Sequence, residues 1–247
     1  MNATRLPGYR RHIAVVPRPG AVLAMLEDDI HAMAVILRHD GITVRRVEAY
    51  PERMPWTTCP RATEKLIETF EGLPLAEITA RREKKQNCTH LHDLAVLAAN
   101  HALDPGPHEW TIAVSDPVDG LRRLDIEKDR RRIHSWTEKD GLLTEPRTIA
   151  GHSLLTLRDR IAALEGEDRE AARLLQWAGL VAHGRTLPEE RQSRAADLPP
   201  NCYTFQPQRA LHAKRVGDRF DFSSGSRVPL AGFGDRMITL LDGSALA

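Results

Sequence analysis

Several patterns that would assign a protein class at once are missing from this sequence. It has only three cysteines, too few and odd in number for a disulfide framework. No run approaches the ~20 apolar residues that a membrane-spanning helix needs. The first residues, MNATRLPGYRRHI, lack the apolar segment of a signal peptide. We therefore expect a cytoplasmic protein with reduced thiols.

The sequence also lacks an excess of charge of either sign, because its formal net charge is only +1. This balance gives no reason to expect a nucleic-acid partner or an anionic membrane surface. The sequence contains no GxGxxG, P-loop or GxSxG motif, so it offers no nucleotide-binding or serine-hydrolase signature. What remains is a chain of 247 residues with 41% apolar content, which is long enough to bury a core.

The N-terminal region has the pattern of an antiparallel β-meander. Apolar, β-branched runs separated by turn residues predict four strands, at 9–17, 20–27, 30–38 and 42–50. In the third run His31 shares one face with Met33, Val35 and Leu37, because side chains alternate along a strand. The Asp-Gly pair at 40–41 predicts the hairpin that follows.

Helices are expected next. Pro60 in a first turn and Gly72 as a stop predict one helix, and a short second helix is predicted at 75–82. Asn87 or Thr89 can cap a third helix, which ends before 104–109.

The rest of the chain repeats strands and helices before becoming irregular. Strands are predicted at 109–116, 121–127 and 131–137, and helices at 151–165 and 168–183. This pattern predicts an α+β fold in three portions: 1–104 with the candidate site, 105–185 with further strands and helices, and an irregular extension at 186–247. A long irregular extension needs a surface to pack on, so we consider a homodimer.

The stretch NCTHLHDLAVLAANH at 87–101 is the richest in reactive side chains. A cysteine at a helix start has its thiolate stabilised by unpaired N–H groups, so the pKa of Cys88 is expected to fall. His90 and Asp93 are three residues apart and share a helix face, which suits two metal ligands or an imidazole oriented by a carboxylate. The alternative is a buried cysteine followed by polar residues that merely begin a helix.

Two further residues have related settings. Cys59 also stands at a helix start, just before Pro60. His31 lies on an otherwise apolar strand face, where it is either a core histidine or part of a site. Asp28 and Asp29 precede it and either orient it, bind an ion or simply form a turn.

These residues resemble the signature of a bacterial family of unknown function. The family has a Cys-Pro pair followed later by Gly-Cys-Thr-His-Leu, matched here by Cys59-Pro60 and by Cys88-Thr89-His90-Leu91. Asn87 stands where the family has glycine. The resemblance covers about residues 5–103 and leaves 104–247 unexplained.

The order of elements is also similar, more remotely, to the NifU/IscU-type iron–sulfur scaffold fold. In that fold a cysteine near the first strands and two cysteines at later helix starts converge. The corresponding positions here are the stretch 29–31, Cys59 and Cys88, with His31 in place of the first cysteine. The resemblance implies that His31, Cys59 and Cys88 face one pocket, with His90 nearby.

Relatives of the first family are linked to the catabolism of lignin-derived aromatic dimers, and some resemble lyases that release formaldehyde. The resemblance thus implies a carbon–carbon lyase for a phenylcoumaran or diarylpropane, with no cofactor and no metal. His31 or His90 would be the base, assisted by Cys59, Cys88 and Asp93. Tyr203 is a further catalytic candidate, as an acid–base phenol. The following residues are candidates to contact the substrate: Tyr203, Arg10 and Arg11 at a phenolate, and Trp56 against an aromatic ring.

Two other functions remain open. The first is a zinc-binding, iron-binding or cluster-related module that uses Cys59, Cys88 and His90, because thiolate and imidazole suit those metals. The second is a non-catalytic protein whose extension mediates assembly, for which neither metal nor small ligand would shift the melting temperature.

Overall fold

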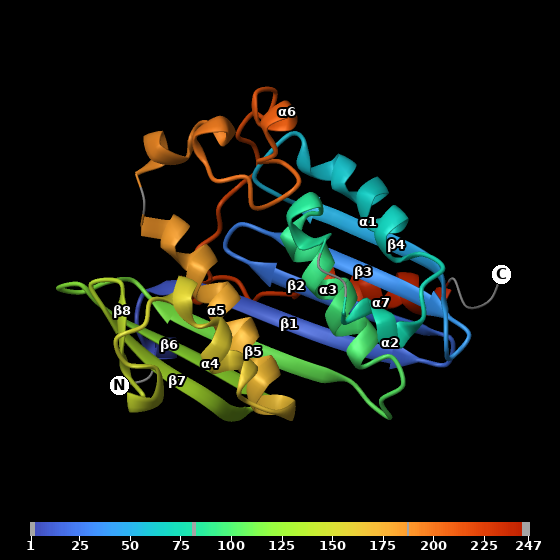
Figure 1. Cartoon of the computed structure of the whole chain (residues 1–247), viewed down its shortest axis with the longest axis horizontal. Coiled ribbons are helices and arrows are strands. Elements are labelled where there is room, and N and C mark those ends of the chain that lie inside the picture. The colour runs from blue at the N-terminus through green and yellow to red at the C-terminus, as the bar shows by residue number, and fades with distance from the viewer. Residues whose placement is uncertain (1–2, 81–82, 187, 244–247) are drawn as a thin grey trace. The chain divides into compact units, whose positions relative to one another are not determined.

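The computed structural model describes residues 3–80, 83–186 and 188–243, and the chain divides into two compact units. Unit 1 comprises Met1–His12, Glu109–Pro188 and Asp221–Pro229. Unit 2 comprises Ile13–His108, Glu189–Phe220 and Leu230–Ala247. Each unit therefore draws on all three portions of the chain that the sequence suggested. Both combine helices with antiparallel strands, as the predicted α+β class requires (Figure 1).

Unit 2 is built on the predicted meander. Its strands are the later part of β1 (Gly8–Arg18), β2 (Ala21–Asp28), β3 (Ala32–His39) and β4 (Val44–Arg53), in the order β4-β3-β2-β1. The register pairs Met25 with Ala34, so that residues 28 and 31 flank the tight β2–β3 turn. All four strands were predicted, with the third and fourth beginning two residues later than expected.

Helices cover both faces of this sheet, which explains why β2 is buried along its whole length. On one face lie α1 (Ala62–Phe70), α2 (Leu75–Ile78) and α3 (Thr89–Asn100). The other face packs against α7 (Phe233–Gly243), as Figure 1 shows behind β2 and β3. Because side chains alternate along a strand, Leu23 and Met25 face α7 while Val22 and Ala24 point to the opposite face.

The helices of unit 2 differ from the expectation at two places. The helix predicted at 75–82 ends at Ile78, and residues 81–82 lie outside those described. The extension predicted to be irregular contains α7, whose residues Phe233, Met237 and Leu241 recur every four positions and form its buried face. It also contains the short helix α6 (Pro207–Ala210).

Unit 1 holds the second group of strands. They are β5 (His108–Ser115), β6 (Leu121–Lys128), β7 (Arg131–Lys139) and β8 (Leu142–Glu145), in the order β5-β6-β7-β8 after the first residues of β1. Two helices follow, α4 (Arg158–Ala162) and α5 (Gly166–Thr186), and α5 packs on β6 and β7. The predicted strands are confirmed, β8 was not foreseen, and the helix expected at 151–165 shrinks to α4.

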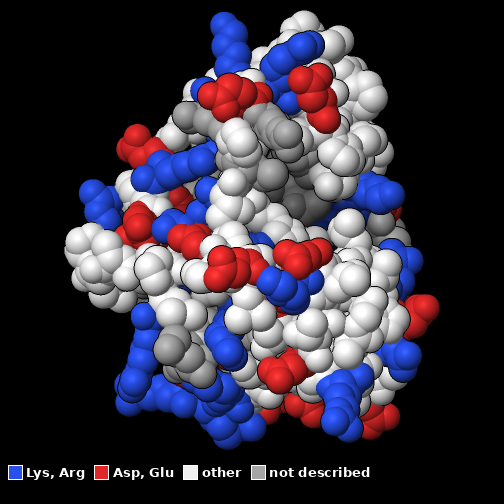
Figure 2. Space-filling view, turned by 90° about the vertical axis from the view of Figure 1, so that its left-hand side faces the viewer, with Lys and Arg blue, Asp and Glu red and all other residues white. Residues whose placement is uncertain are grey.

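The surface carries both signs of charge. Figure 2 shows acidic and basic side chains side by side on the face it presents, in keeping with the formal net charge of +1. Within the ranges that the structure describes, no helix combines the length and apolar character needed to cross a bilayer.

Candidate active site in unit 2

The turn between β2 and β3 places a carboxylate and an imidazole together. Asp28 is fully buried, and its Oδ1 accepts hydrogen bonds from the backbone N–H groups of Ile30 (2.8 Å) and His31 (2.7 Å). An aspartate that binds the backbone two and three residues ahead fixes a tight turn. Arg53 secures this turn from β4, since its Nη2 donates to the carbonyl of Asp28 at 2.7 Å.

The same carboxylate holds the side chain of His31. The Nδ1 atom of His31 lies 3.1 Å from Oδ1 and 3.3 Å from Oδ2 of Asp28. A carboxylate only accepts hydrogen bonds, so Nδ1 carries the proton and Nε2 of the neutral ring is left with its lone pair. Asp28 therefore sets the tautomer that a general base or a metal ligand requires.

His90, in the first turn of α3, joins this pair. Its ring stacks on that of His31, with centroids 3.9 Å apart and planes inclined by 29°. Ligand atoms of Asp28, His31 and His90 all lie within 4.8 Å of one another, and all three residues are buried. The strand histidine and the helix-start histidine, 59 positions apart in the printed sequence, therefore form one centre.

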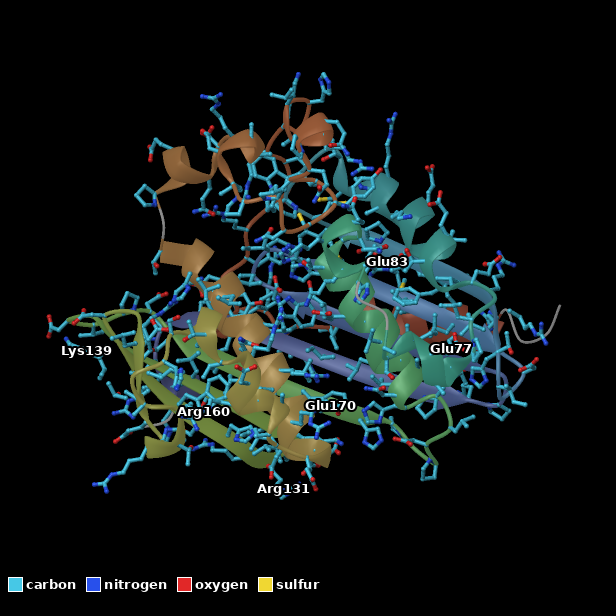
Figure 3. All side chains as sticks on the ribbon, viewed as in Figure 1. Glu77, Glu83, Arg131, Lys139, Arg160 and Glu170 are labelled. Atoms are coloured by element: carbon cyan, nitrogen blue, oxygen red, sulfur yellow. The ribbon has the colours of Figure 1, made fainter. Side chains whose placement is uncertain are left out.

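The start of α3 is fixed by Asn87. This residue is fully buried, and its Nδ2 donates to Thr69 Oγ1 (3.0 Å) and to the carbonyl of Glu83 (3.1 Å), a residue labelled in Figure 3. Asn87 does not have a positive φ, so the backbone at this position does not require glycine. Its amide instead ties the beginning of α3 to α1.

The three thiols lie in buried or partly buried surroundings near this helix start. Cys88 is the N-cap residue of α3, Cys59 begins a short 3-10 turn at Cys59–Arg61, and Cys202 comes from the C-terminal part of unit 2. Thr204 connects the last two segments, since its Oγ1 lies 3.4 Å from Cys59 Sγ and accepts from Thr58 Oγ1 at 3.0 Å.

The expected fall in the pKa of Cys88 is wrong. Burial raises the pKa of Cys88 to about 12, nearby Cys59 and Cys202 raise it further, and the N–H groups of Leu91 and His90 oppose the shift only in part. Burial likewise raises the pKa of Cys59, and it raises that of Cys202 to about 11. The helix-start effect is real but smaller than desolvation, so these residues are protonated thiols near neutral pH.

We expect the thiol of Cys88 to resist alkylation in the folded protein. At pH 8, a thiol with a pKa of about 12 has roughly 10³-fold less thiolate than one with a pKa of 9.0, and the thiolate is the nucleophile. Iodoacetamide labelling followed by peptide mass spectrometry, with and without urea, measures this difference. Equal labelling rates at Cys88 in the two conditions would contradict the assigned burial.

Two predicted residues of the site have other roles. Asp93 forms an ion pair with Lys84; burial acts to raise its pKa, but Lys84 and His92 hold the pKa of this carboxyl below its usual range. Tyr203 lies beneath the guanidinium of Arg209, with 3.9 Å between the Arg209 Cζ atom and the ring centroid. Both side chains thus have stabilising partners of their own.

Trp56 is a buried core residue. Only 2% of it is exposed, and its ring meets that of Phe205 edge-on at 5.9 Å. It packs in one cluster with Cys59 and Ala210. Its stacking on a substrate ring stays a prediction, and it would require this packing to open.

The two predicted arginines, Arg10 and Arg11, belong to unit 1. Arg10 donates to the carbonyls of Ala3 (3.3 Å), Thr4 (3.1 Å) and Leu6 (2.5 Å) and so secures the N-terminal turn. Arg11 is 1% exposed, and its Cζ atom lies 4.2 Å from the ring centroid of Trp177. Both guanidinium groups therefore serve the packing of unit 1.

Sequence reasoning named Asp28 together with Asp29, as acids that orient His31, bind an ion or form a turn, and it missed Arg53 and Thr204. The spacing of Asp28 and His31 across a two-residue turn is a signal that could have singled out the carboxylate, because hairpin geometry brings those positions together. No such signal existed for Thr204, which is 145 residues from Cys59.

Comparison with known proteins finds one family model, of unknown function, that is similar to a segment of the chain. No curated protein and no solved structure matches the chain. Residues 19–104 match the model of a family described as "Protein of unknown function (DUF2889)", and this segment contains β2, β3, β4 and α1–α3 together with Asp28, His31, Cys59, Cys88 and His90.

Proposed function

We propose that the protein is a carbon–carbon lyase that releases formaldehyde from a lignin-derived aromatic dimer of the phenylcoumaran or diarylpropane type. The Asp28–His31 pair carries this proposal, because a buried carboxylate on Nδ1 leaves Nε2 of His31 free to accept a proton. The substrate class rests on the family resemblance, and the choice of His31 over His90 as base rests on the carboxylate partner.

The reaction needs a base and an electron sink. The sink forms first: the substrate phenol loses its proton and its benzylic carbon–oxygen bond breaks, which leaves a quinone methide. The expelled oxygen takes up a proton and remains as the second phenol of an opened phenylcoumaran ring or leaves as water from a diarylpropane. His31 Nε2 removes the proton of the substrate hydroxymethyl group, the carbon–oxygen bond becomes the double bond of formaldehyde, and the adjacent carbon–carbon bond breaks. Its electron pair forms a new carbon–carbon double bond and restores aromaticity in a quinone methide, which becomes a phenolate. The phenolate then takes a proton, so atoms and charge balance without an added oxidant or reductant.

His90 is assigned a positioning role. A ring stacked at 3.9 Å limits the rotation of His31 about its side-chain bonds and keeps Nε2 in a fixed place. A fixed base close to its proton gains from the lower entropy cost of reaching the transition state.

The test is a formaldehyde assay on a panel of phenolic dimers that carry a hydroxymethyl arm. We expect His31→Gln to lower kcat/KM by about 10²–10⁴, the usual contribution of a general base. His212→Gln is the matched control, since His212 is exposed in the same unit. Formaldehyde release from no member of the panel would reject the proposal.

A metal centre is the second candidate, because Asp28, His31 and His90 present ligand atoms within 4.8 Å. Nitrogen lone pairs lie in the ring plane, so two stacked rings point past a common ion rather than toward it, which favours the base. The thiols of Cys59 and Cys88 would complete a zinc or iron set only after losing their protons.

Elemental analysis after metal-free purification separates the two candidates. A stoichiometric zinc or iron content that disappears in a Cys59→Ser, Cys88→Ser double variant or in His90→Gln supports the metal centre. Formaldehyde release by protein with less than a tenth of an equivalent of metal supports the base.

A further inference from the structure

A second cluster of metal-binding side chains lies where α3 ends, also in unit 2. His101 is the C-cap residue of α3, Asp104 lies in the loop that follows, and His108 is the first residue of β5. Oδ2 of Asp104 lies 2.6 Å from His101 Nδ1 and 2.8 Å from His108 Nε2. One carboxylate oxygen is therefore the meeting point of two imidazole rings.

The arrangement of these rings differs from the stacked pair at the other end of α3. The planes of His101 and His108 are inclined by 52°, with centroids 4.6 Å apart. Since both nitrogens are within hydrogen-bond distance of the same oxygen, their in-plane directions converge. The three ligand atoms lie within 4.8 Å of one another.

The chemistry of this set suits a borderline transition metal. Two imidazoles and one carboxylate are a common zinc-binding combination, with metal–ligand distances of about 2.0–2.2 Å. An ion bound between the three ligand atoms requires the Asp104 oxygen to move about 0.5–0.7 Å farther from the two nitrogens, because ligands of a tetrahedral ion lie about 3.3 Å apart. All three side chains are partly exposed, so water can fill a remaining position.

We propose that His101, Asp104 and His108 bind one divalent transition-metal ion, for which zinc is the best fit. His101 is eleven residues beyond His90, or about 16 Å along the helix axis, so this ion is separate from the Asp28–His31–His90 centre. The ion joins the end of α3 to the start of β5 and closes the loop between them. The proposal is independent of lyase activity.

Metal titration of the untagged full-length chain tests this site. Cobalt, followed by its visible absorption, and then zinc in competition are expected to bind with one equivalent at this cluster. We expect His101→Ala, His108→Ala and Asp104→Asn each to weaken binding by at least about tenfold, as the loss of one ligand does. His212→Ala is the control: zinc should raise the Tm of this variant and of the unsubstituted protein, but not that of the three ligand variants.

Two variants, His31→Gln and Asp104→Asn, keep the result decisive. His31→Gln is expected to retain the cobalt spectrum, which distinguishes this site from the one near β2. Asp104→Asn keeps the shape of the side chain and its capacity for neutral hydrogen bonds. It therefore tests metal binding even if circular dichroism shows that a histidine variant does not fold. Absence of stoichiometric binding, or binding unchanged in both His108→Ala and Asp104→Asn, would overturn the proposal.

Discussion

Asp28→Asn is expected to lower formaldehyde release by about 10²–10⁴ in kcat, close to the effect of removing the base itself. The amide keeps an oxygen at the Oδ1 position for the N–H groups of Ile30 and His31, but it places an NH₂ group at the Oδ2 position, 3.3 Å from Nδ1 of His31. A donor at that position favours the other tautomer, in which Nε2 carries the proton and cannot accept one. Steady-state assays of the purified variant measure the loss.

Asp28→Ala should also be strongly destabilising. It leaves two buried backbone N–H groups and the Nδ1 proton of His31 without an acceptor, so we expect a loss of about 3–5 kcal/mol in the free energy of unfolding. Urea unfolding followed by circular dichroism at 222 nm measures it.

Asp40 offers a control with the same local geometry. Its Oδ1 accepts from the N–H groups of Ile42 (2.9 Å) and Thr43 (2.8 Å) in the next hairpin, and its Oδ2 accepts from Arg45 (2.8 Å), whereas Oδ2 of Asp28 lies beside a histidine nitrogen. Asp40→Asn should therefore leave formaldehyde release unchanged. Equal activity in Asp28→Asn and Asp40→Asn would show that the Asp28–His31 contact has no catalytic role.

Gly8→Ala is the second substitution with a large expected effect. Gly8 begins β1 with φ +153°, and an added Cβ would lie 2.2 Å from the carbonyl oxygen of Val114 and 2.7 Å from the Cα atom of Ser115. Both are backbone atoms, so no side-chain rotation relieves the overlap. We expect a loss of about 3 kcal/mol or more in the stability of unit 1.

Tryptophan fluorescence during urea unfolding reports this loss, because Trp110, Trp136 and Trp177 all belong to unit 1. Gly141→Ala is the control: Gly141 also belongs to unit 1 and has φ +85°, but nothing lies within 4 Å of its added Cβ. Backbone strain alone should cost it about 1–2 kcal/mol. Equal losses in the two variants would show that the close approach of Gly8 to β5 is not what limits stability.

The meander was predictable because its information is local. Apolar runs and turn residues such as Asp40-Gly41 specify strand pairs that are neighbours in sequence, and the resulting register places residues 28 and 31 side by side. The buried face of α7 was also present in the sequence, at Phe233, Met237 and Leu241, but a polar and glycine-rich context concealed it.

The long-range parts of the site were not predictable in the same way. Stacking of His31 on His90 depends on how α3 lies across β2 and β3. The pKa values of the thiols depend on burial by distant segments, including the one that supplies Thr204 to Cys59. Position at a helix start indicates where a thiol is, whereas the surrounding packing decides whether it ionises.

The segmented make-up of unit 2 has a practical consequence for dissecting the protein. A fragment trimmed to residues 19–104, the limits of the family match, would omit β1, α7 and Thr204. The outer edge of β2 would then be open to pairing with other molecules, and the apolar side chains of Leu23 and Met25 would meet water. Such a fragment should aggregate, so a soluble minimal version must rejoin the three separate pieces, for example by circular permutation.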